Sequence, residues 1–104
     1  MQSIKQYLLD QYSTDQLQDI VNHGCSGGVN GLIYYTETTA FHDQFETEIW
    51  DMLYEDAEDQ GLTIMQLIAS FNGQKNVGSM EQLKNLLCWY AVESVARKII
   101  EGEM

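Results

Sequence analysis

The chain has 104 residues, the size of one domain, and 44% of them are hydrophobic, which suffices for one core and argues against disorder. Sixteen acidic against five basic residues give a net charge of −11 at pH 7. So acidic a surface excludes general binding to nucleic acids or anionic membranes, since both are polyanions. It leaves basic proteins, cations or no particular partner.

Capping patterns and glycines divide the chain into helices. The Ser/Thr-x-x-Gln pattern, in which two side chains satisfy free N–H groups of a first helical turn, begins at Ser13, Thr63 and Ser79. Each pattern precedes an apolar periodic stretch, and single glycines stand where those stretches end. These signals predict helices over residues 2–11, 14–23, 38–60, 64–72 and 80–101.

Residues 24–37 match the capping and periodicity patterns of helices less well than the rest of the chain does. The stretch "VNGLIYYT" is compatible with a short helix or with a strand, because Ile33, Tyr34 and Tyr35 slightly favour β structure. No second convincing strand is present to pair with it. We therefore expect a helix or a loop here.

The glycine-rich segment "HGCSGGVNG", residues 23–31, fits neither a phosphate loop, nor a zinc site, nor a reactive thiol. A phosphate loop would need Gly-Lys-Ser/Thr, and a zinc site would need His42 and Cys88 from far along the chain. Cys25 follows a helix C-terminus, whose dipole disfavours a thiolate. The acidic "DAEDQG" lacks the downstream Glu of a calcium loop. We predict reduced cysteines, no metal and no cofactor.

The last predicted helix, 80–101, is apolar on every side for two turns, in "LLCWYAV" at residues 86–92. Such a helix is buried all round, or it is buried on one side and docked to a partner on the other. We expect it at the centre of the fold. Trp89 lies opposite Leu87, so it reaches a second layer of core or sits at an oligomer contact. The predicted core is Leu83, Leu87, Ala91, Val95 and Ile99 with Ile49 and Leu53.

Half of the acidic residues lie in residues 42–61, which contain no Lys or Arg. At about 100° per residue, six residues of this helix share one side, with the tyrosine on its flank. We call this set the acid face: Glu48, Asp51, Tyr54, Glu55, Glu58 and Asp59. Like charges one turn apart destabilise a helix by a few tenths of a kcal/mol per pair. A local cost without structural return points to function; the alternative is an ordinary solvated face.

Two further carboxylates in this helix, Glu46 and Asp56, point toward its apolar side, where an acid needs a partner. Glu46 follows His42 by one turn, which predicts a pair between these two side chains. The basic residues that could take the same place are Lys84, Arg97 and Lys98. The sequence places no nucleophile beside His42 that this residue could serve as a base, so we predict no catalytic residue.

Three stretches carry a resemblance: "GLIYYTETTAF", "EIWDMLYEDAEDQGLTIMQLIASFNG" and "NLLCWYAVESVARKI". Over about residues 24–100 the chain resembles a family of small, uncharacterised proteins from phages and prophages, which has no catalytic motif to carry over. The run "EIWDMLYEDAED" is similar in composition to the helices of phage DNA-mimic antirestriction proteins. These resemblances imply a protein of a mobile element that inhibits a restriction or CRISPR complex.

We thus expect a compact all-α bundle of about five helices, a single domain over residues 1–104. We expect a cytoplasmic protein, because the first residues, "MQSIK", lack an apolar signal core. We expect it to act by binding and not as an enzyme, because it has no catalytic motif. Its acid face would occupy the basic surface of a nucleic-acid-binding protein complex, with no direct contact to nucleic acid or membrane. The alternative is a homo-oligomeric structural or adaptor protein that uses an aromatic patch around Trp50 and Trp89. The oligomeric state, monomer or small homo-oligomer, stays open.

Overall fold

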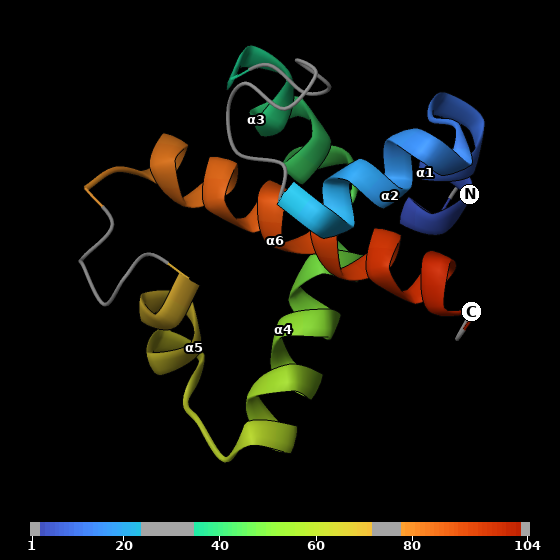
Figure 1. The fold of residues 1–104 in the computed structure, drawn as a ribbon. Helices are drawn as coiled ribbons and strands as arrows, with labels where there is room; N and C mark the ends of the chain where they lie inside the picture. Colours follow the sequence, from blue (N-terminus) through green and yellow to red (C-terminus); the bar gives the residue numbers. More distant parts are fainter. Residues whose placement is uncertain (1–2, 24–34, 72–77, 103–104) are drawn as a thin grey trace.

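The computed structural model describes residues 3–23, 35–71 and 78–102, and the regular structure in these ranges is entirely helical. The all-α prediction is confirmed. The helices are α1 (Ile4–Gln11), α2 (Thr14–His23), α3 (Tyr35–Gln44), α4 (Glu46–Gln60), α5 (Ile64–Phe71) and α6 (Met80–Glu101) (Figure 1). Five of the six begin or end within two residues of a predicted boundary. Residues 24–34, for which we expected a helix or a loop, lie outside the described residues. Residues 35–37 of the same stretch belong to α3.

The predicted capping patterns form. At α2, the backbone N–H of Ser13 donates to Gln16 Oε1 over 2.8 Å, and the N–H of Gln16 donates back to Ser13 Oγ over 3.2 Å. The pattern at Thr63 makes the same two bonds. At α6, Ser79 Oγ accepts from the N–H of Gln82, while the Gln82 side chain accepts from the glycine before Ser79. Free N–H groups of three first turns are thereby satisfied, which fixes where these helices begin.

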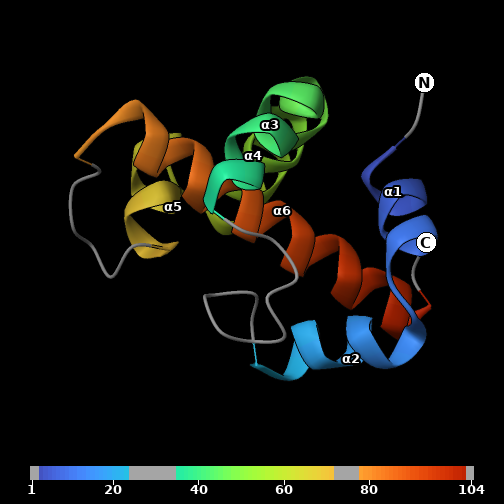
Figure 2. The ribbon, with the colours of Figure 1, turned by 90° about the horizontal axis from the view of Figure 1, so that it is seen from above.

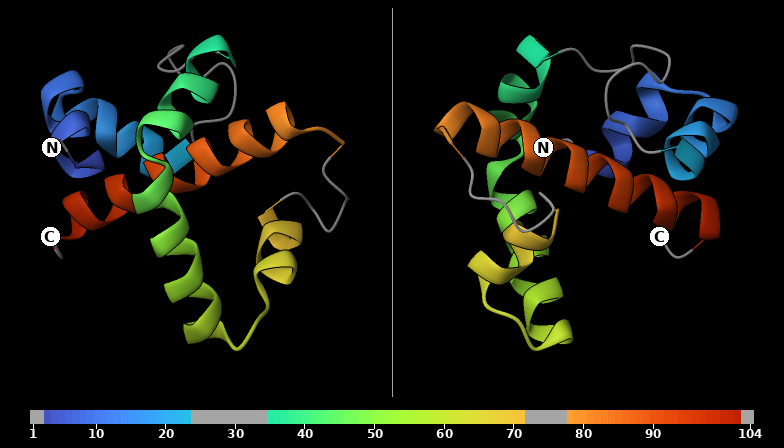
Figure 3. Two further views of the ribbon diagram at one scale, coloured as in Figure 1. Left: turned by 180° about the vertical axis from the view of Figure 1, so that it is seen from behind. Right: turned by 60° about the vertical axis from the view of Figure 1, so that its left-hand side comes forward.

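Two glycines end helices as predicted. Gly61 follows α4 with φ +69°, and Gly102 follows α6 with φ +73°, a left-handed conformation that costs other residues free energy. At Gly61 the chain reverses: its N–H donates to the Glu58 carbonyl over 3.2 Å, and the next N–H, of Leu62, donates to the Ala57 carbonyl over 2.9 Å. The reversal sends α5 back alongside α4 (Figure 3).

The predicted helix 38–60 is wrong in one respect: it is two helices, broken at Phe45. The backbone at Phe45 has φ −111° and ψ 21°, although hydrogen bonds continue across it, from Phe45 to Phe41 and from Ile49 to Phe45. Phe41 and Phe45 both meet the ring of Tyr7 from α1 edge-on, with centroids 5.4 and 5.6 Å apart. The break lets this aromatic cluster form while α4 turns to bury Ile49 elsewhere in the core.

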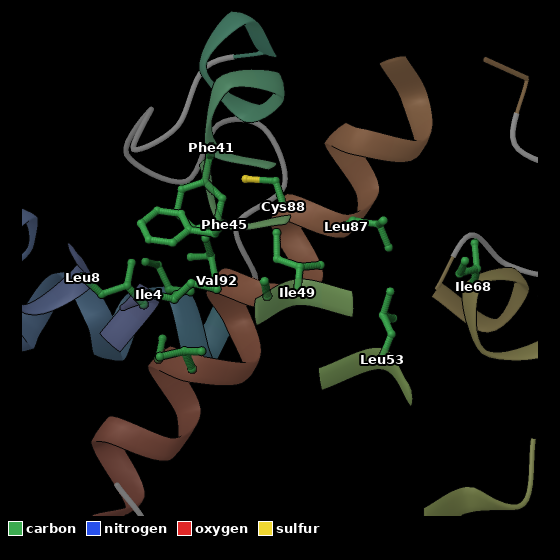
Figure 4. Packing of buried hydrophobic residues seen from close by; sticks show 14 of the residues in the cluster. Ile4, Leu8, Phe41, Phe45, Ile49, Leu53, Ile68, Leu87, Cys88 and Val92 are labelled. Carbon is green, nitrogen blue, oxygen red and sulfur yellow. The ribbon is translucent and has the colours of Figure 1, made fainter. Parts of the chain in front are cut away.

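Helix α6 is central, as predicted, and its neighbours lie on two sides of it. In Figure 1, α1, α2 and α3 lie above α6, whereas α4 and α5 project below it. Seen from above, α6 runs between α2 and α3 (Figure 2). The buried side chains of these helices meet around Leu87, Cys88 and Val92 (Figure 4). None of the described helices is both long and apolar enough to cross a membrane.

The predicted core is largely confirmed. Its fully buried members are Ile49, Leu53, Leu87, Ala91 and Val95, whereas Leu83 and Ile99, nearer the two ends of α6, are half-buried. The opposite stripe of α6 is only half-covered. Trp89 lies there, half-buried and packed against the core cluster, and its neighbours Leu86 and Tyr90 are half-buried too. The helix that is apolar all round is therefore fully covered on one side only.

Candidate functional site

The acid face lies on the part of α4 that projects from the rest of the fold. Ile49, Leu53 and Ala57 bury the opposite side of α4 against the core, which turns the acidic side outward. Its four exposed carboxylates are Asp51, Glu55, Glu58 and Asp59. Within the described ranges, the ion pairs with Lys or Arg involve other acids, so none of these four charges is neutralised there.

Tyr54 gives the acid face an aromatic edge. Its side chain is 61% exposed, which places it among the exposed large hydrophobic side chains of the described residues. Trp50, one turn earlier and half-buried, lies beside it with ring centroids 6.5 Å apart and a tilt of 46°. An exposed aromatic ring beside unpaired charges is typical of protein interaction surfaces.

Glu48 differs from the rest of the acid face. It is half-buried, and its Oε1 accepts a hydrogen bond of 3.0 Å from the backbone N–H of Ile4, the first residue of α1. Ser3 Oγ accepts from the N–H of Gln6 in the same turn. Glu48 therefore completes the cap of α1 from a distant part of the sequence, and its carboxylate lies at the positive end of that helix.

The predicted pair between His42 and Glu46 is wrong. The break at Phe45 makes Glu46 the first residue of a new helix, where it is exposed. His42 is buried, and its Nδ1 lies 3.1 Å from Oδ1 of Asp43. Lys84 of α6 reaches the same oxygen over 2.8 Å. The hydrogen bonds from Lys84 and then His42 lower the pKa of Asp43 below its ordinary 3.8.

A pocket of about 420 Å³ opens between α4, α5 and α6. Asp56 of α4 forms one wall, and Phe71 closes the α5 side. The α6 wall is the half-covered stripe that begins at Leu86, continues through Trp89 and Tyr90, and ends at Arg97. The α6 wall is thus the side that α1–α3 leave uncovered. It is apolar at Leu86, Trp89 and Tyr90 and polar at Glu93, Ser94 and Arg97.

Asp56 and Tyr90 join α4 to α6 inside this pocket. The Tyr90 hydroxyl donates a hydrogen bond to Asp56 Oδ2, and its ring stacks on Phe71 with centroids 4.6 Å apart and an angle of 21°. Burial, the bond to Asp56 and the charge of Glu55 raise the pKa of Tyr90 far above 10, so the phenol stays protonated. Asp56 has no Lys or Arg partner within the described part of the chain.

Sequence analysis identified Asp56 as an acid in need of a partner but missed the partner and the pocket. The predicted partners were basic residues, whereas the donor is a tyrosine inside the apolar run 86–92. The overlooked signal is that a buried tyrosine hydroxyl needs an acceptor as much as a buried carboxylate needs a donor.

One of the two cysteines, Cys88, lies within the described residues. Cys25 lies outside the described residues. Cys88 is a free, buried thiol whose pKa is raised to about 12 by burial, which makes it a core residue and a poor nucleophile. The described ranges contain no group of three or more His, Cys, Asp or Glu side chains placed to hold a metal ion.

Comparison with known proteins gives a family and no function. Neither curated proteins nor solved structures yield a significant match. One family model matches residues 1–103, and its description is "Domain of unknown function (DUF7222)". Because this match spans almost the entire sequence, the chain belongs to the DUF7222 family of uncharacterised domains.

Proposed function

We propose that this protein acts by binding and not by catalysis, and that the acid face of α4 occupies a basic surface on a nucleic-acid-binding protein complex. The observation that carries the proposal is the set of four exposed carboxylates on α4 that lack a basic partner within the described residues. Residues 51–59 extend over about 12 Å of helix at 1.5 Å per residue.

The chemistry of this surface supports a protein partner built to hold phosphates. A groove that binds nucleic acid presents Lys and Arg to a row of negatively charged phosphates. A helix with one row of carboxylates offers such a groove the same negative charge as the phosphates do. The exposed ring of Tyr54 supplies an anchor beside the charges. Complementary charge speeds association and makes it sensitive to salt.

The proposed targets are host defence complexes that handle nucleic acid, of the restriction or CRISPR type. The support is the resemblance of the chain to small proteins of phages and prophages, and of "EIWDMLYEDAED" to antirestriction helices that mimic DNA. In this proposal the protein is an inhibitor made by a mobile element. It acts in the cytoplasm and competes with nucleic acid for the same basic groove.

Two charge-matched variants test the proposal. The first neutralises the acid face with Asp51→Asn, Glu55→Gln, Glu58→Gln and Asp59→Asn, and it leaves the Glu48 bond to α1 intact. The control carries Asp15→Asn, Glu46→Gln, Glu81→Gln and Glu101→Gln, four exposed acids placed elsewhere. Both lose four negative charges, so any difference between them reports the position of the charge and not its total.

Binding to a panel of purified restriction and CRISPR complexes would be measured by surface plasmon resonance at several salt concentrations. We expect wild type and control to bind one complex, to compete with its DNA or RNA, and to weaken as salt rises. The acid-face variant should associate markedly more slowly, with a shallower salt dependence. Equal binding by both variants, or binding indifferent to salt, would show that the acid face is an ordinary solvated surface.

The second candidate, a homo-oligomeric adaptor, predicts a shared apolar patch. The exposed large apolar side chains in the described residues are Leu9, Tyr54, Met65 and Met80, and each comes from a different helix. These four side chains therefore form no stripe on one helix, and the half-covered apolar stripe of α6 at Leu86, Trp89 and Tyr90 lines the pocket. A light-scattering mass near 11.9 kDa at micromolar concentration is expected; a dimer at every concentration would favour the adaptor.

A further inference from the structure

The pocket on α6 accounts for a sequence feature that the core leaves unexplained. A helix that is apolar all round is either buried on every side or docked to a partner on the side left free. Here α1, α2 and α3 cover one side of α6, while Leu86, Trp89 and Tyr90 face a pocket of about 420 Å³. This volume lies at the lower end of the range for ligand sites. It suits one long side chain better than a large cofactor.

The walls of the pocket are suited to a flat, partly apolar group. Tyr90 stacks on Phe71, and Trp89 lies one residue from Tyr90 on the same side of α6. Aromatic faces attract cations, and they do so most strongly when the cation is planar and weakly hydrated. The aliphatic part of such a group would pack on Leu86.

The charge inside the pocket is negative. Asp56 is half-buried, and the one hydrogen bond described for its carboxylate comes from the neutral hydroxyl of Tyr90 to Oδ2. Arg97 Nη2 lies 3.7 Å from Glu93 Oε1, near the outer limit for an ion pair. The charges of these two side chains cancel, so the pair adds no net charge to the pocket. The carboxylate of Glu55 adds to the negative field at Tyr90. A half-buried carboxylate beside aromatic rings favours a cation as its partner.

We infer that this pocket binds an arginine side chain of the basic partner, with the guanidinium stacked on the aromatic wall and paired with Asp56. The inference rests on the proposed function, because it assigns an anchor to the same interface. On α4, Asp56 lies next to Glu55 and one turn before Asp59 and Gln60, so the pocket adjoins the acid face. Arginine fits better than lysine, because only a guanidinium combines stacking with a fork of donors for a carboxylate.

Three small probes test the pocket without any partner. N-acetyl-L-arginine amide, N-acetyl-L-lysine amide and N-acetyl-L-norleucine amide would each be titrated into the ¹⁵N-labelled protein. The indole N–H signals of Trp89 and Trp50 separate the pocket from the acid face. We expect the arginine probe to shift the Trp89 signal saturably and to bind more tightly than the lysine probe, with no saturable shift from norleucine.

A single substitution tests the role of the carboxylate. Asp56→Asn keeps the size of the side chain and an oxygen for Tyr90, so the fold should persist. We expect it to weaken the arginine probe by about tenfold to a hundredfold, since hydrogen bonds to charged groups contribute this much. Asp15→Asn, which removes an exposed acid on α2, should leave probe binding unchanged.

The outcomes separate this inference from the proposed function. Norleucine binding as well as arginine, a shift at Trp50 alone, or an Asp56→Asn variant with wild-type affinity would each overturn the arginine pocket. The probe comparison on wild-type protein decides the first two even when the variant misfolds. Failure of the acid-face variant to differ from its control in partner binding would overturn the proposed function, whatever the probes show.

Discussion

The carboxylate of Glu48 accepts a hydrogen bond from the backbone N–H of Ile4, 44 positions earlier in the sequence, over 3.0 Å. Ile4 opens α1, so this N–H has no acceptor within its own helix. The bond fixes α4 to the first turn of α1 and puts a negative charge where the helix dipole is positive. Glu48 therefore has a structural task that the other acids of its helix do not share.

Removing this carboxylate should destabilise the fold. We expect Glu48→Ala to lower the free energy of unfolding by about 0.5–2 kcal/mol, the usual cost of a lost helix cap. Glu48→Gln, which keeps an acceptor but no charge, should cost less. Urea denaturation at pH 7 measures both. Glu46→Ala, an exposed acid two residues away, is the control and should stay within about 0.5 kcal/mol of wild type; equal losses at the two positions would contradict the cap.

Shortening a buried side chain at the centre of α6 should lower the free energy of unfolding more than loss of the Glu48 cap does. Leu87 is fully buried between α6 and its neighbours, so Leu87→Ala should cost about 2–5 kcal/mol through lost burial and the remaining cavity. Leu9→Ala, on the exposed side of α1, should cost much less. Denaturant melts of Leu87→Ala that overlay those of wild type would show that α6 is not the centre of the core.

The thiol of Cys88 should be unreactive in the native protein. Burial raises its pKa from 9.0 to about 12, so the folded protein holds the proton over a range in which the unfolded chain releases it. Its contribution to stability is therefore complete below pH 9 and declines as the pH rises from 9 toward 12. In a Cys25→Ser background, alkylation by iodoacetamide at pH 8 should be slow without denaturant and fast in urea. Fast alkylation of the native protein would contradict the buried position.

The Asp43 carboxyl should titrate below its ordinary value because Lys84 and His42 stabilise the charged form. A lowered folded-state pKa contributes stability above pH 3.8 and loses that contribution as the pH falls through the folded-state pKa. NMR titration of the side-chain carboxyl carbon measures the midpoint directly. Lys84→Met removes the largest cause and should raise the midpoint toward 3.8; an unchanged midpoint would show that Lys84 is not the partner.

Neutralising the acid face should not harm the fold. Asp51 and Glu55, and Glu55 and Asp59, are like charges four residues apart on one helix, and each such pair costs a few tenths of a kcal/mol. The four-fold variant at Asp51, Glu55, Glu58 and Asp59 should therefore melt at or above the wild-type temperature in low salt. The gain should shrink in high salt, where repulsion is screened. Circular dichroism melts test this, and a marked loss of stability would indicate that these side chains make structural contacts.

The ends of the helices could be predicted because their signals are local. Ser13 with Gln16 and Ser79 with Gln82 are three residues apart in the sequence and bond within one turn. A glycine such as Gly61 marks a helix end because few other residues adopt its conformation. Amphipathic spacing likewise predicted which side of α4 is buried, since that depends only on the helical period.

The break at Phe45 and the site around Asp56 could not be predicted, because both depend on distant residues. No Gly, Pro or capping pattern precedes Phe45; its conformation follows from packing with Tyr7 of α1. Asp56 meets a hydroxyl 34 positions away, on Tyr90. The pocket exists only because α4 and α5 hold Phe71 across from α6. Local patterns carry no information about such placements.

The central position of α6 also sets an order on biosynthesis. Helices α1, α2 and α3 bury their apolar side chains mainly against α6, which is the last of the described helices to leave the ribosome. Until residues 80–101 have been made, those apolar faces have no surface to pack on, and the nascent chain stays open to chaperones and proteases. A product that stops before Met80 would thus lack the helix on which α1, α2 and α3 pack, and their apolar faces would stay exposed.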